Sequence, residues 1–191
     1  MNVHIKEPHI LTYSGLNFLL YGEDIDAFRL EDIAHSLSMQ CRYTGHTKQF
    51  YSVAEHCILM SRYVTDLDCK VMALYHDAVE TYIGDIASPV KRSLPDYRKL
   101  EDAIERRLFM WLGYSIPSRV KKLIKILDTR IMLQERNELL PAINEQWIEN
   151  EVVTPLDVDI MCWNPARAEK EYLKQAEQIR QLVTKRKGPL L

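Results

Sequence analysis

The stretch HDAVETYIGD, residues 76–85, brings four titratable side chains close together: His76, Asp77, Glu80 and Asp85. Desolvating such groups costs free energy unless they are paired, hydrogen-bonded or bound to a metal. Imidazole and carboxylate together suit divalent cations such as Zn²⁺, Mn²⁺, Co²⁺, Ni²⁺ or Fe²⁺, and an ion with an open position can activate a water molecule. The stretch therefore indicates metal-dependent chemistry.

Two further side chains complete a candidate set of metal ligands. His56 lies upstream of the His76-Asp77 pair, and Asp128 lies downstream of it. Adjacent residues on a helix point about 100° apart, so His76 and Asp77 can share an ion only if it lies near the helix surface between them. Glu80 follows this pair by about one helical turn, which would place an acid or base beside the ion.

Taken alone, each of these residues has a simpler interpretation. A single inward-facing histidine such as His56 is more often a hydrogen-bonded core residue than a ligand. Asp128 could belong to a solvated helix face or pair with Lys125 or Arg130. The same reservation applies to the remaining histidines, His4, His9, His35 and His46. The order His, His-Asp, Asp favours a metal site, together with the sequence motifs that flank these residues.

Hydrophobic periodicity predicts the elements that must position these side chains. The expected helices cover about residues 30–40, 52–65, 69–82, 97–112, 117–141 and 164–185, with a long loop over 142–163. The segment ILTYSGLNFLLY, residues 10–21, predicts a hairpin around Ser14-Gly15. Asn164-Pro165 is typical of a helix start.

Two of these helices carry candidate ligands on a defined face. Ser52 and Glu55 fit a capping box, in which each side chain bonds to the other's backbone N–H. Val53, His56, Met60 and Tyr63 should then share the interior face of that helix. In the later helix, Asp128 lies beside the predicted core stripe of Leu123, Ile124, Leu127, Ile131 and Leu139.

Length and composition exclude several classes of protein. With 191 residues, 47% hydrophobic and 27% charged, the chain should fold as a single domain over residues 1–191. A net charge of −2 leaves no basic footprint for a nucleic-acid polymer. No apolar run approaches the roughly 20 residues that span a bilayer. Four cysteines without a CxxC pair, and no signal peptide, favour a reducing cytoplasm.

The words YSVAEH (51–56), HDAVETYIGDIASPVK (76–91) and LDTR (127–130) resemble the HD superfamily of metal-dependent phosphohydrolases. More narrowly, they resemble bacterial 5′-deoxynucleotidases and phage dATP triphosphohydrolases, over about residues 30–135. The resemblance implies an all-α fold, an HD-domain bundle of about six helices with a small N-terminal β-hairpin. It also implies a divalent metal (Zn, Mn, Co, Ni, Fe or Mg), a nucleotide as small-molecule partner and, we expect, a homo-oligomer.

The resemblance also implies roles for individual residues. His56, His76, Asp77 and Asp128 would bind the metal, with Asp96, Asp102 or Asp157 as replacements if Asp128 is misplaced. Glu80 would be the catalytic acid or base, and Asp85 would lie near the sugar. Arg42 would contact the phosphate and Tyr43 the nucleoside. His46, Lys48 and Lys91 would either add positive charge or be ordinary surface residues.

The reaction that follows is hydrolysis of the bond between the 5′-oxygen and the α-phosphorus of a deoxynucleotide, with dATP or dAMP favoured. The same bond cleavage releases phosphate from a monophosphate and triphosphate from a dNTP, so the motif alone does not separate the two substrates. One alternative is a phosphodiesterase or alarmone hydrolase on the same fold. Another is a nucleotide-binding regulator without turnover.

Overall fold

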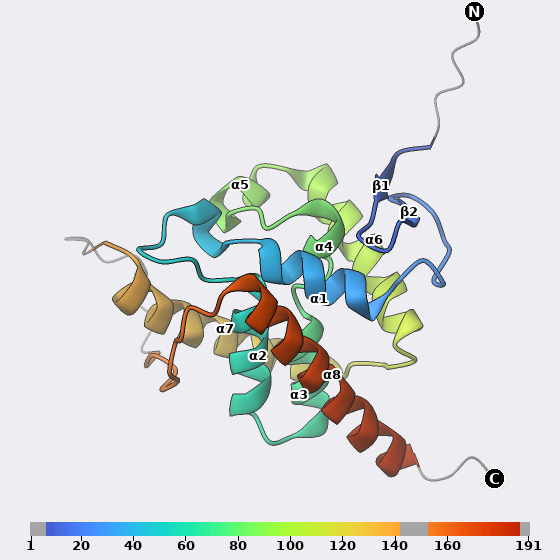
Figure 1. Ribbon diagram of the computed structural model, residues 1–191. Coiled ribbons are helices and arrows are strands. Elements are labelled where there is room, and N and C mark those ends of the chain that lie inside the picture. The colour runs from blue at the N-terminus through green and yellow to red at the C-terminus, as the bar shows by residue number, and fades with distance from the viewer. Residues whose placement is uncertain (1–6, 142–152, 188–191) are drawn as a thin grey trace, which may run out of the picture.

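A computed structural model describes residues 7–141 and 153–187 of the chain (Figure 1). The helices are α1 (Leu30–Met39), α2 (Val53–Tyr63), α3 (Leu67–Tyr75), α4 (Glu80–Ile83), α5 (Ser88–Arg92), α6 (Pro95–Trp111), α7 (Ser118–Leu139) and α8 (Pro165–Lys187), and a 3₁₀ turn, η1, covers Arg42–Gly45. Within the described ranges, α4 and α5 are single turns of 4 and 5 residues, which leaves six longer helices. The predicted all-α fold is confirmed.

The predicted N-terminal hairpin is also confirmed. Strand β1 (His9–Leu11) pairs antiparallel with β2 (Asn17–Leu19), and Gly15 takes a positive φ of 83° in the turn between them. The backbone N–H and hydroxyl of Ser14 donate to the carboxylate of Asp32, at 2.7 and 2.9 Å. These bonds fasten the hairpin turn to the first turn of α1.

The C-terminal helix closes the bundle. Figure 1 shows α8 lying across α1, α2 and α3, and it packs against all three. Tyr172 is fully buried, and its hydroxyl donates to the carbonyl of Leu74 at 2.8 Å. Asn164 caps α8 as predicted, because its side chain accepts the backbone N–H of Arg167 at 2.9 Å. Helix α8 therefore covers the face of α2 and α3 behind the candidate ligands.

Half of the predicted capping box is present at the start of α2. The Ser52 hydroxyl accepts the backbone N–H of Glu55 at 3.1 Å, as expected. The Glu55 carboxylate does not return to Ser52, because it accepts the backbone N–H groups of Met161 and Trp163 at 2.8 and 2.6 Å. A buried carboxylate thus ties the segment before α8 to α2.

The predicted single helix over residues 69–82 is wrong, since the chain forms two helices. Helix α3 ends at Tyr75 and α4 begins at Glu80. Between them the bonds span three residues, as from Glu80 N–H to Asp77 C=O at 2.9 Å and from Ala78 N–H to Tyr75 C=O at 3.1 Å. His76 keeps helical dihedrals, which is why the hydrophobic pattern continues unbroken. The His-Asp pair therefore lies at the carboxyl end of α3.

Two residues of the predicted core stripes lie at the surface. Leu123 is 49% exposed, whereas Ile124 and Ile131 on the same helix are buried. Leu123 lies about 100° around α7 from Ile124, which carries it outside the buried stripe. Tyr63, the last residue of α2, is 41% exposed.

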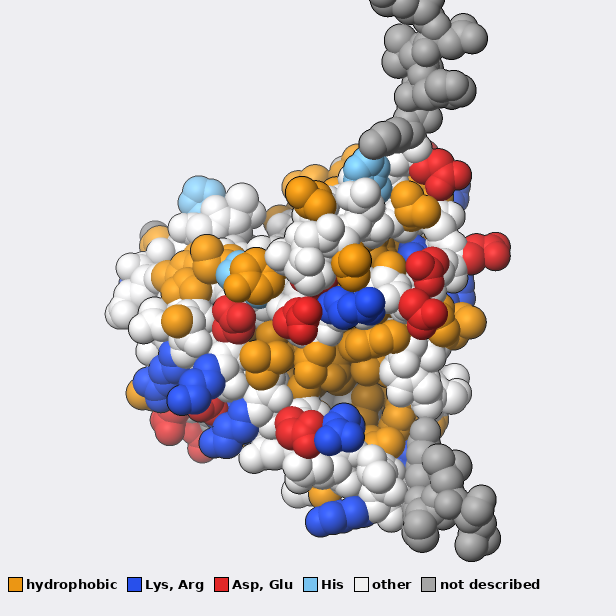
Figure 2. Space-filling model, turned by 45° about the vertical axis from the view of Figure 1, so that its right-hand side comes forward, with side chains coloured by type: hydrophobic (Ala, Val, Ile, Leu, Met, Phe, Trp, Pro, Cys, Tyr) orange, Lys and Arg blue, Asp and Glu red, His pale blue; other side chains and the backbone are white. Residues whose placement is uncertain are grey.

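Hydrophobic side chains reach the surface near the hairpin, as Figure 2 shows beside the start of the described chain. Leu11, Tyr13 and Tyr21 are 66–74% exposed. Tyr13 stacks on the ring of His35 with centroids 3.7 Å apart. None of the described helices contains an apolar stretch that could span a membrane.

Arg107 of α6 holds the loop that follows the hairpin. Its guanidinium donates to the carbonyls of Leu19 and Asp24 at 3.0 and 2.9 Å and lies 4.7 Å from the ring centroid of Phe18. The Arg107 side chain is buried, so its removal would take a charged donor from these carbonyls, and water would replace that donor poorly.

We predict that Arg107→Ala lowers the free energy of unfolding by about 2 to 4 kcal/mol, because hydrogen bonds from a charged donor and buried packing are both lost. Arg106→Ala, at the exposed neighbouring position, is the matched control and should change it by less than about 0.5 kcal/mol. Urea unfolding measures both. Equal effects of the two substitutions would contradict this role.

Candidate metal centre

Three elements converge to bring the predicted ligands together. His56 comes from α2, His76 and Asp77 from the turn after α3, and Asp128 from α7. Helix α3 packs against both α2 and α7, which sets the distance between these side chains. The four residues that the sequence predicts as ligands therefore form one cluster.

The donor atoms of this cluster lie close together. His56 Nε2 is 3.3 Å from His76 Nε2 and 3.3 Å from Asp128 Oδ1, and His76 Nε2 is 3.3 Å from Asp77 Oδ2. One donor atom from each of His56, His76 and Asp77 lies within 4.8 Å of the others, which makes these residues a possible metal-binding group. Asp128 is the fourth member of the cluster, and its side chain is 44% exposed.

Hydrogen bonds at the far nitrogens orient both imidazole rings. His56 Nδ1 lies 2.6 Å from Glu135 Oε1, and His76 Nδ1 lies 2.8 Å from the carbonyl of Ala73. Both partners are acceptors, so each Nδ1 carries a proton and each Nε2 is left facing the cluster. Two imidazoles and two carboxylates arranged in this way fit a divalent ion, and outer hydrogen bonds of this kind are usual for histidine ligands.

Asp128 is held in its charged form. Partial desolvation disfavours a charged carboxylate, but the hydrogen bond from His56 and the positive charge of that ring outweigh it and lower the pKa of Asp128 below its usual value. The alternative ligand Asp96 has a side chain 92% exposed that pairs with Lys99. Asp102 and Asp157 are exposed as well. The structure thus brings Asp128, rather than these three, to His56.

Glu80 lies one turn beyond the His-Asp pair, as the sequence predicts. Its carboxylate is buried, and Oε1 accepts from Lys91 Nζ at 3.1 Å. Burial, followed by the charges of Asp77 and Asp85, raises the pKa of Glu80 well above its usual value, although Lys91 opposes the shift. Oε2 has no hydrogen-bond partner within residues 7–141 and 153–187. A group of this kind can hold a proton at neutral pH.

The structure also brings the predicted basic-aromatic pair to the cluster. Arg42 Nη1 lies 3.4 Å from Asp77 Oδ2, and the guanidinium is mostly buried. Tyr43 takes a positive φ of 56°, and its hydroxyl donates to Glu135 Oε2 at 2.6 Å. Both residues belong to η1, whose compact turn carries their side chains inward.

The remaining predicted residues differ in position. Asp85 follows α4 half-buried, and its backbone N–H donates to Gln40 Oε1 at 2.9 Å. Lys91 Nζ is shared between Glu80 and Glu101, at 3.1 and 2.7 Å. His46 and Lys48 are exposed, and Lys48 Nζ donates to the carbonyl of Glu138 at the end of α7.

Sequence reasoning missed Glu135, the residue that joins these parts. It is fully buried on α7 and receives contacts from His56, Tyr51, Tyr43 and Arg42. Burial opposes its charge, but Arg42 and His56 outweigh burial and lower the pKa of Glu135 to about 2. The available signal was its spacing, because seven residues, two helical turns, separate it from Asp128.

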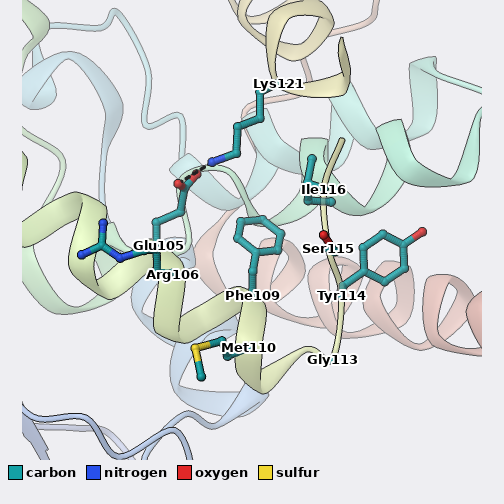
Figure 3. A pocket seen from close by; sticks show the side chains of 9 residues that line it. All are labelled: Glu105, Arg106, Phe109, Met110, Gly113, Tyr114, Ser115, Ile116 and Lys121. Carbon is teal, nitrogen blue, oxygen red and sulfur yellow. Dashed lines mark hydrogen bonds and ion pairs between the residues drawn. The ribbon is translucent and has the colours of Figure 1, made fainter. Parts of the chain in front are cut away.

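A pocket lined by residues within 105–121, none of which belongs to this cluster, lies where α6 ends and α7 begins (Figure 3). It has a volume of about 550 Å³ and is lined mainly by apolar side chains, such as Phe109, Tyr114 and Ile116. Lys121 and Glu105 form an ion pair at 2.7 Å across its edge. It contains none of the predicted site residues.

An all-α fold that brings a His-Asp pair together with one further histidine and one further aspartate defines an HD-type protein. Residues 43–143 match a family model described as 5′-deoxynucleotidase YfbR-like. The protein belongs to this YfbR-like family of HD-domain proteins, which confirms the resemblance seen in the sequence. All four candidate ligands and Glu80 fall within the matched residues.

Two relatives have names that assign no activity. The chain is 38% identical over 130 residues to the uncharacterized protein YfdR of Escherichia coli K12, covering 68% of this chain and 71% of the relative. It is 33% identical over 111 residues to an uncharacterized protein of Rhodobacter capsulatus, covering 52% of this chain and 57% of the relative. These two relatives therefore add no substrate to the family assignment.

We predict that His76→Ala and Asp77→Ala each abolish stoichiometric binding of Mn²⁺ or Co²⁺ while circular dichroism shows the same helix content. Ligands to one ion act as a unit, so the double substitution should lose no more than either single one. Asp96→Ala, at an exposed aspartate, is the control and should bind metal normally. Calorimetric titration of metal-free protein measures all four. Unchanged stoichiometry in both single variants would contradict the site.

Proposed function

We propose that this protein hydrolyses deoxynucleotides at the bond between the 5′-oxygen and the α-phosphorus, with dAMP or dATP as substrate. The observation that carries the proposal is the convergence of His56, His76, Asp77 and Asp128, with Nε2 and carboxylate oxygens facing one another. The match to a family described as 5′-deoxynucleotidase supports it.

The four ligands would hold a divalent ion, whether Zn, Mn, Co, Ni, Fe or Mg. When bound, such an ion would lower the pKa of a water molecule, so that hydroxide would be available as the nucleophile near neutral pH. The side chains around the cluster must then bind the phosphate, deliver a proton and select the sugar.

Glu80 is our candidate for the proton donor. The bond from phosphorus to the 5′-oxygen breaks, and this oxygen is a poor leaving group unless it gains a proton. Its raised pKa favours the protonated form of Glu80, and the contact with Lys91 fixes the carboxyl group at Oε1. We therefore assign Lys91 to holding Glu80 instead of to the phosphate. The products are the deoxynucleoside and either phosphate or triphosphate.

Arg42 is our candidate for the phosphate contact. Its guanidinium lies beside Asp77 and has five donors, two of which can engage one phosphate. Tyr43, next in the chain, would contact the nucleoside through its ring. Asp85 lies at the end of α4 and would accept a hydrogen bond from the sugar.

The test is a screen of all dNMPs, dNTPs and the matching ribonucleotides with Mn²⁺, Co²⁺, Zn²⁺ and Mg²⁺, with phosphate, triphosphate and nucleoside as measured products. We expect release of deoxynucleoside, fastest for a purine. Cleavage of phosphodiesters or alarmones alone would contradict the proposal, and nucleotide binding without any product would indicate a regulator.

We predict that Glu80→Gln, which preserves the shape of the side chain, leaves metal binding unchanged. It should lower kcat by about 10² to 10⁴, the range typical of general acid or base catalysis. Glu105→Gln, which alters a carboxylate paired with Lys121 outside the cluster, is the control and should keep kcat. Steady-state kinetics at saturating metal measure both. A Glu80→Gln variant as fast as wild type would assign Glu80 a structural role.

A further inference from the structure

We propose that Glu135 is a positioning residue that holds two parts of the site at once, the metal ligand His56 through Oε1 and the nucleotide loop through Oε2. The nucleotide loop is η1, residues 42–45, and its name rests on the proposed function. One carboxylate would thus connect the ion to the substrate contacts.

The Oε1 side fixes a metal ligand. His56 Nδ1 lies 2.6 Å from this oxygen and the Tyr51 hydroxyl 2.9 Å from it, and all three side chains are fully buried. The contact sets the plane of the imidazole and leaves Nε2 facing His76 and Asp128. Losing such an outer contact typically weakens metal affinity 10-fold to 100-fold.

The Oε2 side fixes the loop. It accepts the Tyr43 hydroxyl at 2.6 Å, and Arg42 Nη2 lies 3.3 Å from it. Three consecutive loop residues have positive φ, namely Tyr43 at 56°, Thr44 at 54° and Gly45 at 78°. Residues other than glycine disfavour this conformation, so it persists where neighbouring groups stabilise the loop. Glu135 supplies that hold, because both loop side chains end on the same oxygen.

The two oxygens can be tested separately, because each has a tyrosine whose hydroxyl can be removed without changing the ring. Tyr51→Phe removes a donor from Oε1 and leaves the loop side chains in place. Tyr43→Phe removes a donor from Oε2 and leaves the partners of His56 in place. Glu135→Gln alters both sides, since its amide must turn an N–H₂ group toward donors on one side.

The experiment is a titration of metal-free protein with Co²⁺, read from the visible absorption band of the bound ion, together with KM for dAMP at saturating Co²⁺. We expect Glu135→Gln to weaken Co²⁺ binding about 10-fold to 100-fold, shift the band and raise KM. Tyr51→Phe should weaken Co²⁺ binding and keep KM, whereas Tyr43→Phe should keep Co²⁺ binding and raise KM.

Glu138→Gln, at an exposed position on the same helix, is the matched control and should behave as wild type. If Glu135→Gln lowers only thermal stability, with Co²⁺ affinity, band and KM unchanged, Glu135 is a core residue and the inference is wrong. Equal effects of the two phenylalanine variants on Co²⁺ affinity would also overturn it, and they carry the test if Glu135→Gln does not fold. The Co²⁺ titration needs no turnover, so it still decides the role of the contact with His56 in a wild type that cleaves no nucleotide. The assignment of η1 as the nucleotide loop would then fail together with the proposed function.

Discussion

The contact between Glu135 and His56 is the interaction on which the rest of the site depends. A fully buried carboxylate is expensive to desolvate, and Glu135 offsets this cost by receiving donors at both oxygens. The arrangement joins α7 to α2 through the interior and fixes which nitrogen of His56 faces the cluster. Without it, the His56 imidazole would lose the contact that sets its plane, whereas His76 would keep its own contact with the Ala73 carbonyl.

The fold supplies the other constraints on the cluster. Helix α3 ends at Tyr75, and the tight turns that follow place His76 and Asp77 at its carboxyl end. Helix α8 covers the back of α2 and α3, while the Glu55 carboxylate secures the segment that leads into α8. The ligands therefore belong to packed elements, and Asp128, with a side chain 44% exposed, is the most exposed of the four.

Much of this architecture could be predicted, because long amphipathic segments carry a clear periodicity. The cap at Asn164 and the hairpin at Ser14-Gly15 follow from local chemistry and were predicted correctly. The helix break at His76 was missed because its dihedrals remain helical, and α5 was missed because a helix of 5 residues has no measurable period. Local signals end where the chain changes its hydrogen bonding without changing its composition.

Local sequence signals predicted only part of the candidate site. Residue type, order and the motifs of the family predicted four ligands, namely His56, His76, Asp77 and Asp128. Glu135 was missed because it lies in a charged stretch, ERNELL, that resembles a solvated helix end. Its partners Tyr43, Tyr51 and His56 are 79–92 residues away in the chain, so only the fold reveals them.

We expect one divalent ion to bind between α2, the end of α3 and α7. Anomalous diffraction from crystals grown with Co²⁺, recorded on both sides of the cobalt absorption edge, would locate this ion. A single strong peak should lie within bonding distance of His56 Nε2, His76 Nε2 and carboxylate oxygens of Asp77 and Asp128. A peak bound by other side chains, or no peak among these four, would contradict this expectation.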